Sequence, residues 1–271
     1  QGTLALEETT RVFIVDGIRR LLPDLNTTSD PAPVNALRMI KSPAEIALMQ
    51  RANDIMLAAY RAMHAQVQAG MTGDDISASM AREIVRGGGK RASGSAQIGP
   101  GSALPHGSKE RLKLGEGMVV LMDCTCSFHG YAADISRTFV FGEPTAEQRR
   151  VFGQMRQAMS VVMEAAQVGA TAGSVDDAVR RYYGKLGYGP GYALPGLSHR
   201  TGHGIGLDVH EPVNLVGGET TRLAPGMCFS NEPGLYFPGR FGIRIEDCFA
   251  MTERGPRFFT QPPSSLDKPF G

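Results

Sequence analysis

Apolar positions recur at helical spacing in four segments of the chain, and these segments fall into two pairs. The first pair covers about 42–68 and 74–86, and the second covers about 145–167 and 176–184. After each pair, apolar and polar positions alternate as they do in strands, first over about 94–141 and again towards the end of the chain. The pattern therefore predicts two halves, each built as helix, helix and strands.

The helix boundaries carry the same signals in both halves. Ser42-Pro43-Ala44-Glu45 and Thr145-Ala146-Glu147-Gln148 open the first helix of each pair with a capping-box pattern. The breaks QAGMTGDDI (68–76) and QVGATAGSVDDA (167–178) share Gln, Gly, Thr, Gly and Asp-Asp in the same order, about 100 residues apart. Together they indicate an internal duplication. We therefore expect an α+β fold in which four helices back a curved antiparallel sheet, with the two halves related by a pseudo-twofold axis.

The first residues follow a different pattern from the rest. Residues 5–22 form an amphipathic helical pattern, and the proline-bounded segment 23–33 is typical of a linker. We divide the chain at this point, with 1–35 as one unit and 36–271 as the main domain. The chain starts at Gln1 without a methionine, which indicates a fragment or a renumbered chain.

Composition narrows the classes of protein. With 42% hydrophobic and 20% charged residues, the chain can bury a sizeable core. The net charge of +1 gives no global field for nucleic acid or an anionic membrane, and we expect neither as a partner. No apolar run approaches the roughly 18 residues of a transmembrane helix, and no signal peptide is expected. The four cysteines lack the dense spacing of a disulfide scaffold, which favours reduced thiols in a cytoplasmic protein.

Four carboxylates and one imidazole stand inside apolar or glycine-rich runs that predict strands. A cluster of buried acids requires cations, because an unpaired carboxylate costs several kcal/mol to bury. Two divalent metal ions would cancel four negative charges. The alternative is that these residues are ordinary acids on the surface. That alternative does not explain why each of them lies in an apolar or glycine-rich stretch of sequence. The candidate metal ligands are Asp123, Asp134, His203, Glu232 and Glu246.

The spacing of these residues predicts where they lie. Asp123 and Asp134 are eleven residues apart, with Gly130-Tyr131 between them, as in two strands joined by a hairpin. A hairpin would bring Asp134 back beside the first ligand, where it can bridge two metals. Glu232 and Glu246 each lie in a short run whose composition is typical of a strand, so we expect both ligands to be carried on strands. Cys124 and Cys126 alternate with Asp123, so they should point away from the metal face.

Other motifs of catalysis and nucleotide binding are excluded. The glycine-rich run 202–207 lacks the spacing of a dinucleotide-binding loop, and 87–90 is not a phosphate-binding loop, because Arg91 stands where Ser or Thr would contact magnesium. The chain contains no His-Glu-x-x-His motif. Arg244, two residues before Glu246, would share a strand face with it and hold a ligand carboxylate, or else lie on the surface of an edge strand.

Four motifs together resemble the pita-bread metallopeptidases, which include aminopeptidase P, prolidase and methionine aminopeptidase. The motifs are His199-xxx-His203-Gly-Ile-Gly, Asp208-Val-His-Glu211, Asn231-Glu-Pro-Gly234 and Gly242-Ile-Arg-Ile-Glu-Asp247. The resemblance covers roughly 36–260 and implies the pita-bread fold with all five ligand positions filled. The Arg-Ile-Glu-Asp form of the last motif and the 17-residue gap from His106 to Asp123 look more like the Xaa-Pro branch. Thr125 departs from the glycine that is usual in the family.

The resemblance also implies roles for particular side chains. His106, His199 and His210 match positions that contact substrate, where they would stabilise the oxyanion and protonate the leaving proline nitrogen. Glu232 would take the proton of the attacking water, in addition to binding metal. The other two histidines, His64 within a helix and His129 at a hairpin tip, are expected to be structural or solvent-facing and not catalytic.

The expected activity is hydrolysis of the Xaa-Pro bond at a free N-terminus, with an Xaa-Pro dipeptidase preferred over aminopeptidase P acting on longer peptides. A creatinase-like hydrolase and an inactive pita-bread binding module are the alternatives. Carboxylate-rich ligation favours two manganese ions, with cobalt, zinc and iron left open. The resemblance also implies a homodimer, and it makes residues 1–35 the C-terminal remnant of a smaller α/β domain.

Overall fold

The computed structural model describes residues 2–104, 107 and 111–270. The first half of the main domain has two helices followed by three strands, as the sequence pattern predicts. These elements are α3 (Pro43–His64), α4 (Gly73–Arg86), β3 (Lys90–Ile98), β4 (Val119–Phe128) and β5 (Tyr131–Val140), with a short 3₁₀ helix η1 (Gly99–Ala103) after β3. The strands form an antiparallel sheet in the order β3-β4-β5.

The second half repeats the scheme with two helices and a larger set of short strands. The elements are α5 (Ala146–Ala165), α6 (Ala172–Lys185), β6 (Gly202–Gly204), β7 (Glu211–Leu215), β8 (Cys228–Asn231), β9 (Leu235–Phe237), β10 (Phe241–Ile243), β11 (Asp247–Thr252) and β12 (Gly255–Phe258). Five of the strands form a sheet in the order β12-β11-β8-β6-β7, and β9 pairs with β10.

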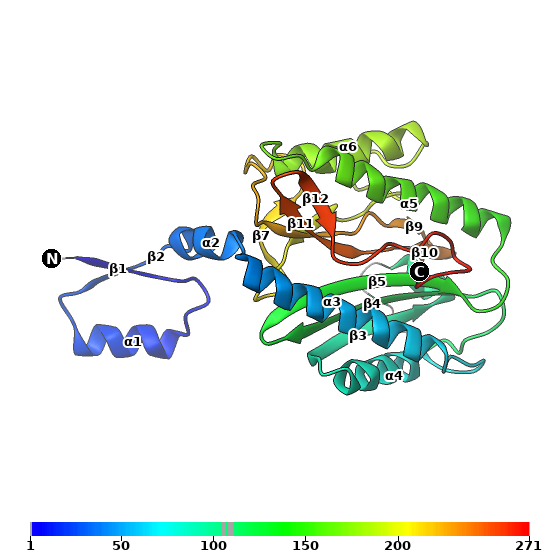
Figure 1. The fold of residues 1–271 in the computed structure, drawn as a ribbon, viewed down its shortest axis with the longest axis horizontal. Coiled ribbons are helices and arrows are strands. Elements are labelled where there is room, and N and C mark those ends of the chain that lie inside the picture. Colours follow the sequence, from blue (N-terminus) through cyan, green and yellow to red (C-terminus); the bar gives the residue numbers. More distant parts are fainter. Residues whose placement is uncertain (1, 105–106, 108–110, 271) are drawn as a thin grey trace.

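The sheets of the two halves form the middle layer of the main domain. In Figure 1, α3 and α4 lie along one side of the strands, and α5 and α6 lie along the other. An antiparallel bridge between Ser136 of β5 and Glu246, just before β11, joins the two sheets. The prediction of an α+β fold with antiparallel sheets backed by four helices is confirmed.

Local capping explains where the helices begin. Ser42, Thr72 and Thr145 are the N-caps of α3, α4 and α5, and each has a capping box with the residue three positions later. Thr171 caps α6 through the backbone amide of Ser174, so this helix begins four residues before the predicted start at Asp176. The N-cap Thr, present in both halves, decides where the helix starts, although Asp-Asp had suggested a later start. Its side-chain oxygen accepts a hydrogen bond from a backbone amide of the first turn that would otherwise have no partner.

The duplicated breaks have matching tertiary partners. Thr72 forms an isolated antiparallel bridge with Lys113, and Thr171 forms one with Arg222. In each half the second helix is thus tied at its N-terminus to the segment that leads into a strand. The residues repeated in the sequence therefore make equivalent backbone contacts in the two halves.

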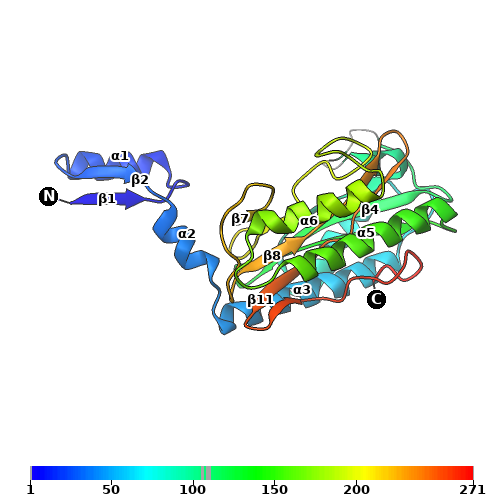
Figure 2. The same cartoon turned by 90° about the horizontal axis from the view of Figure 1, so that it is seen from above.

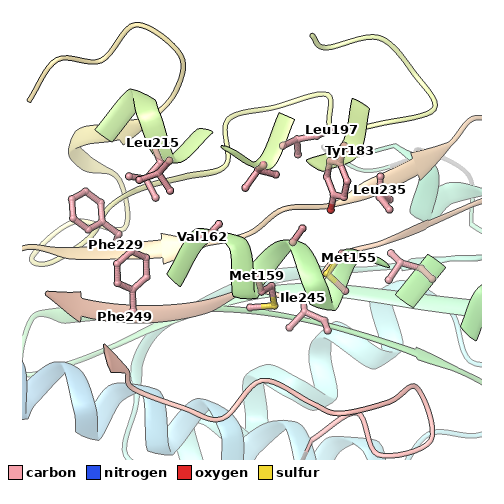
Figure 3. Close-up of a cluster of buried hydrophobic side chains, with 14 of the residues drawn as sticks. Met155, Met159, Val162, Tyr183, Leu197, Leu215, Phe229, Leu235, Ile245 and Phe249 are labelled. Atoms are coloured by element: carbon pink, nitrogen blue, oxygen red, sulfur yellow. The ribbon is translucent and has the colours of Figure 1, made fainter. Parts of the chain in front are cut away.

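Two apolar clusters hold the helices on the sheets. Figure 3 shows the cluster beneath α5 and α6, where Met155, Met159 and Val162 pack with Ile245. A second cluster lies beneath α3 and α4 and includes Cys124 and Cys126. Both thiols are buried and unpaired, as predicted, because strand alternation turns them away from the face that carries Asp123.

The N-terminal segment differs from its prediction. It contains β1 (Thr3–Leu6), α1 (Val12–Leu21), β2 (Asn26–Ser29) and α2 (Ala32–Met39), and it extends away from the main domain in Figures 1 and 2. The predicted helix 5–22 starts too early, and the predicted linker 23–33 contains a strand. Parallel pairing of β1 with β2 decides this, because backbone hydrogen bonds between separate segments leave no strand pattern in either segment alone.

Helix α2 spans the predicted boundary between residues 35 and 36 and is anchored to the main domain by ion pairs. Arg38 lies 2.6 Å from both Asp208 and Glu211, and Lys41 lies 2.8 Å from Glu211. Lys41 and Glu211 are almost completely buried. Within the described residues, no helix is both long and apolar enough to cross a membrane.

Candidate metal centre

The β4–β5 hairpin places the first two candidate ligands on one face of its sheet. Its turn residues His129 and Gly130 have φ of 47° and 92°, which is the left-handed conformation that a tight two-residue hairpin requires. Asp123 lies opposite Ser136, and Thr125 lies opposite Asp134. Residues that face each other across two strands, and those two apart on one strand, point to the same side of a sheet.

The other three candidate ligands lie at or beside strand ends of the second half. His203 is the middle residue of β6, Glu232 follows β8 directly, and Glu246 precedes β11. The Glu232 amide donates to the carbonyl of Thr201 at 3.0 Å, and this bond ties the segment to the approach to β6. The bridge with Ser136 brings Glu246 to the hairpin.

All five predicted ligands meet in one place. His203, Glu232 and Glu246 each offer one ligand atom within 4.8 Å of the others, and Asp123, Asp134 and Glu246 form a second such group. Glu246 belongs to both groups. The His203 Nε2 atom lies 3.6 Å from Asp134, 3.5 Å from Glu232 and 4.0 Å from Glu246. Two overlapping groups with a shared carboxylate match the chemistry of a site for two adjacent cations.

The ring of His203 is oriented for ligation. Its Nδ1 lies 3.0 Å from the carbonyl oxygen of Gly204, which can only accept a hydrogen bond. Nδ1 therefore carries the proton and Nε2 presents its lone pair to the carboxylates. A backbone bond of this kind fixes the tautomer and the ring orientation of metal-binding histidines.

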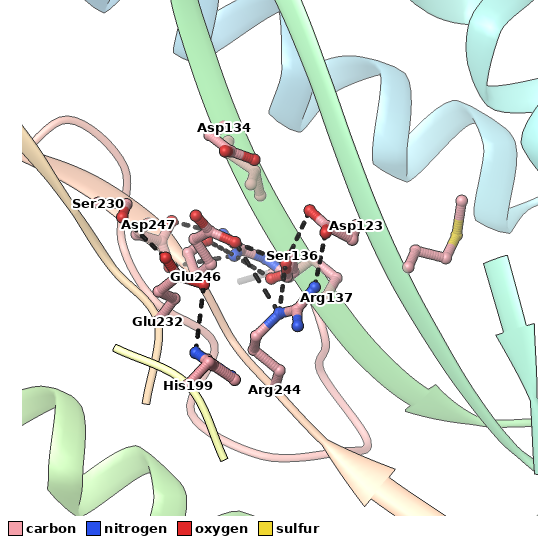
Figure 4. Close-up of polar contacts among 12 residues, drawn as sticks. Asp123, Asp134, Ser136, Arg137, His199, Ser230, Glu232, Arg244, Glu246 and Asp247 are labelled. Carbon is pink, nitrogen blue, oxygen red and sulfur yellow. Dashed lines mark hydrogen bonds and ion pairs between the residues drawn. The ribbon is translucent and has the colours of Figure 1, made fainter. Parts of the chain in front are cut away.

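A polar network supports the carboxylates from behind (Figure 4). The Ser136 hydroxyl lies 2.7 Å from Glu246 and 3.2 Å from Asp123. The Arg244 Nη2 atom lies 2.7 Å from Asp123, while Nε donates to Ser136 at 3.0 Å and Nη1 donates to the Tyr236 hydroxyl at 2.9 Å. Arg244 is only 3% exposed, so it is not a surface arginine. Its guanidinium holds the cluster together through three different partners.

The electrostatics of the cluster indicate a site built to hold cations. Burial, reinforced by neighbouring carboxylates, raises the pKa of Asp134 to about 6 and raises the pKa of Glu246 well above its ordinary value. Asp134 Oδ1 and Glu246 Oε1 are buried and have no hydrogen-bond partner in the described part of the chain. Orphaned carboxylate oxygens of this kind are costly unless an ion binds them. The donor set therefore fits divalent metal ions.

Glu232 differs from the other acids. Burial would raise its pKa, but the positive charge that His203 and His199 carry when protonated, together with Arg244, outweighs burial and lowers the pKa. Ser230 donates to its Oε1 at 3.2 Å. The carboxylate is thus held ionised and ready to accept a proton.

Two of the three predicted substrate-contacting histidines lie in the same pocket, whose volume is about 380 Å³. The His199 Nδ1 atom is 2.7 Å from the Arg200 carbonyl and 3.8 Å from Glu232, and its Nε2 is 2.8 Å from the Tyr236 hydroxyl. Because the carbonyl only accepts, Nδ1 carries the proton and Nε2 accepts from Tyr236. His106, the third of these histidines, lies outside the described residues.

His210 lies against the candidate ligand His203. The two rings meet edge to face with centroids 4.4 Å apart. His210 also forms a possible ligand group with Asp134 and His203. Burial lowers the pKa of His210, and positive charge on Arg200, and on His203 when that ring is protonated, lowers it further.

Several site residues left no signal in the sequence. Ser136 and Tyr236 have ordinary neighbours in the chain, and only the tertiary structure brings them to Arg244. Arg200, which follows His199, lines the pocket as well. Asp176 and Arg180 of α6 act one step further away. The buried Asp176 accepts from Arg180 at 2.7 Å, and Arg180 donates to the His199 carbonyl at 2.9 Å. Helix α6 therefore fixes the loop that carries His199.

Comparisons with known proteins agree with this site. The model of metallopeptidase family M24 matches residues 47–253. The Xaa-Pro dipeptidase of Lactobacillus helveticus is 34% identical over 92% of the chain, and the probable dipeptidase PepE of Mycobacterium tuberculosis is 38% identical over 81%. These matches cover 67% and 58% of the two relatives.

Solved structures show the same architecture. The X-Pro aminopeptidase of Thermotoga maritima superposes with a TM-score of 0.89 at 30% identity, covering 96% of this chain and 74% of that one. The prolidase of Pyrococcus furiosus gives 0.87 at 29% identity, with 96% and 76% covered. The pita-bread arrangement predicted from the sequence is therefore confirmed.

Proposed function

Because the chain belongs to metallopeptidase family M24, we propose that it hydrolyses the bond between an N-terminal residue and proline, as an Xaa-Pro dipeptidase. The observation that carries this proposal is the pair of ligand groups that share Glu246, together with the orphaned oxygens of Asp134 and Glu246. Carboxylates buried so close together repel one another and are stable in the ionised form only when cations bind between them.

Two divalent metals would be held by the five candidate ligands. Asp123, Asp134, His203, Glu232 and Glu246 would hold these ions, and the orphaned oxygens of Asp134 and Glu246 would gain partners from them. When bound, the ions polarise the scissile carbonyl and lower the pKa of the attacking water. We propose manganese, since four carboxylates and one imidazole form a predominantly hard, oxygen-rich set.

The protein's own groups would move the protons. Glu232, held ionised, takes the proton of the attacking water. His199 and His210 lie in the pocket with Glu232 and stabilise the oxyanion and the leaving nitrogen, with His106 assigned to the same task. An Xaa-Pro bond needs such help because its nitrogen lacks a hydrogen and leaves only when protonated. Arg244 keeps Asp123 and Ser136 in position.

The substrate class is supported by the relatives. Both the Lactobacillus helveticus relative and the Pyrococcus furiosus structure carry names of proline-specific dipeptidases. The Thermotoga maritima structure, an X-Pro aminopeptidase, favours the alternative in which longer peptides are cleaved. The test is to assay manganese-loaded protein on Ala-Pro, Ala-Pro-Ala, Met-Ala-Ser and creatine.

The four substrates separate the candidate functions. Preference for Ala-Pro supports the dipeptidase, and preference for Ala-Pro-Ala makes the protein an aminopeptidase. Cleavage of Met-Ala-Ser alone, or of creatine alone, contradicts the proline assignment. A protein that binds two metals yet cleaves none of the four is a binding module.

The assembly and location of the protein complete the proposal. We propose a homodimer in the cytoplasm, with residues 1–35 as the end of a smaller α/β domain. The parallel β1-α1-β2 unit supports this division, because it is a fragment of the kind of sheet that such domains contain. Side chains such as Val12, Phe13 and Leu21 are exposed on α1, which is typical of a face covered by other protein. Sedimentation of the purified protein tests the dimer.

A further inference from the structure

His210 lies at the end of the segment 205–210, which connects β6 to β7 and belongs to neither a helix nor a strand. Two backbone hydrogen bonds hold the start of this segment, where the Gly206 amide donates to Asp208 at 3.0 Å and the Gly206 carbonyl accepts from Ala132 at 2.7 Å. Among the described residues, the His210 side chain has no hydrogen bond, and its ring contact is the one with His203. The position of this imidazole in the pocket therefore depends on what holds the end of the segment.

Glu211 supplies this support from the position after His210. Its Oε1 atom accepts from the backbone amides of Leu207 at 2.8 Å and Asp208 at 3.3 Å. One carboxylate thus ties the middle of the segment to the first residue of β7. Hydrogen bonds to an ionised acceptor are roughly twice as strong as neutral ones. The backbone on both sides of His210 is therefore fixed by the side chain of its neighbour.

Two cations at the C-terminal end of α2 hold the Glu211 carboxylate in turn. Lys41 Nζ donates to Oε2 at 2.8 Å, and Arg38 Nη2 donates to Oε1 at 2.6 Å. The side chains of Lys41 and Glu211 are only 3% and 2% exposed, so solvent screens this pair weakly. A Cβ atom on Gly206 would lie 2.6 Å from Lys41 Cε and 2.7 Å from Glu211 Oε2, which shows how closely the pair packs against the segment. Figures 1 and 2 show α2 beside β7.

We propose that Glu211 is a positioning residue, which holds His210 in the metal pocket and is itself held in place by α2. This inference rests on the proposed Xaa-Pro activity, in which His210 contacts the substrate, and it links that activity to the docking of α2. Glu211 is not among the residues that line the metal pocket, so its effect reaches the reaction through His210. Displacement of a catalytic group by about 1 Å can lower the rate roughly 10²-fold.

A double-mutant cycle on the manganese-loaded protein tests whether Glu211 acts through His210. Glu211→Gln removes the charge and keeps the size of the side chain. It should lower kcat for Ala-Pro roughly 10-fold or more, with metal content and KM nearly unchanged. In a His210→Ala background the same substitution should lower kcat no further, because the ring that Glu211 positions is gone.

The matched control is a substitution that weakens the fold without reaching His210. Ile76 is fully buried in the core beneath α3 and α4, so Ile76→Ala should destabilise the domain and leave kcat per bound metal at the wild-type value. Arg38→Gln is a milder variant, because the Arg38 side chain is 26% exposed and Glu211 keeps Lys41. It should lower kcat less than Glu211→Gln does, again only when His210 is present, and it carries the test if Glu211→Gln does not fold.

Losses of kcat that multiply in the double variant overturn the proposal, because Glu211 would then act independently of His210. An unchanged kcat in Glu211→Gln, or an equal loss in Ile76→Ala, overturns it as well. Failure of the wild-type protein to cleave Ala-Pro while it cleaves Met-Ala-Ser is a different result, because it rejects the proline assignment. The same cycle on Met-Ala-Ser then decides the role of Glu211. A wild-type protein that cleaves neither peptide rejects both proposals.

Discussion

Asp134 and Glu246 each bury a carboxylate oxygen that has no hydrogen-bond partner among the described residues. Asp123, in contrast, is bonded to Arg244 and Ser136, and Glu232 is bonded to Ser230. Ser136 also donates to the other oxygen of Glu246. The two orphaned oxygens lack such support from the protein, which makes Asp134 and Glu246 the positions that depend most on a cation.

Replacement of Asp134 by Ala should therefore remove bound metal and abolish hydrolysis together. Elemental analysis of the purified variant and an Ala-Pro assay measure the two losses. The control is Asp74→Ala, since the Asp74 side chain is 75% exposed at the start of α4 and is remote from the ligands in sequence. An Asp134→Ala protein with normal metal content and activity would contradict the two-metal proposal.

His199→Ala and His210→Ala should behave differently from the ligand variant. Each should keep its metal and lose roughly 10²-fold or more in kcat, the scale of positioned donors and acid-base groups. His64→Ala is the control, because His64 packs against Phe139 and Phe270 and is not among the residues that line the metal pocket. Because His210 forms a group with Asp134 and His203, loss of metal in His210→Ala would make this histidine a ligand.

At the scale of elements, the site depends on segments that are anchored from outside it. Helix α6 holds the His199 loop through Arg180, and β7 carries Glu211 next to His210. Glu211 in turn anchors α2 through Arg38 and Lys41. The ion pairs of Glu211 therefore connect the N-terminal segment to one wall of the pocket.

The Lys41–Glu211 pair should make stability depend on pH. Burial would raise the pKa of Glu211, but hydrogen bonds from Lys41 and Arg38 outweigh burial and lower it. A lowered pKa stabilises the fold above the unfolded value of about 4.5 and loses that contribution as pH falls through the folded value. Glu211→Gln, which leaves Lys41 buried without its partner, should cost about 3–5 kcal/mol at pH 7.

Urea unfolding of wild type and Glu211→Gln at pH 7 and pH 4 measures this dependence. The difference in unfolding free energy should shrink at the lower pH. Glu219→Gln is a suitable control, because the Glu219 carboxylate accepts from the amide and hydroxyl of the neighbouring Thr221 and has no ion pair among the described residues. An equal difference at both pH values would show that the charge of Glu211 contributes nothing to stability.

At the scale of the whole molecule, the metal site joins the two halves. Asp123 and Asp134 come from the first half, and His203, Glu232 and Glu246 come from the second. Among backbone contacts at the site, the bridge between Ser136 and Glu246 links the halves directly. Bound metal would therefore connect the halves at their centre.

Removal of metal should accordingly lower the stability of the entire main domain. A ligand that binds only the folded state raises its stability in proportion to the logarithm of free ligand over Kd. We expect the protein treated with a chelator to melt several degrees lower, and manganese to restore the wild-type Tm. Asp134→Ala should melt at the same temperature with and without manganese. An unchanged Tm in chelated wild type, with loss of metal verified, would contradict a structural link between the halves.

The sequence by itself determined the features that depend on near neighbours. The capping boxes at Ser42 and Thr145, the hairpin between Asp123 and Asp134, and the alternation that buries Cys124 follow from bonds and periodicities within a few residues. The motifs around His203 and Glu246 allowed the fold and the family to be predicted. Several motifs at fixed spacings rarely occur together by chance in an unrelated protein.

Only the tertiary structure decided which distant groups meet. The parallel pairing of β1 with β2, the shared position of Glu246 in two ligand groups, and the bonds of Arg244 to Tyr236 join segments that leave no mark on one another in the sequence. Arg244 is the clearest case, because its partners Asp123, Ser136 and Tyr236 come from both halves of the domain and meet it only when the chain is folded.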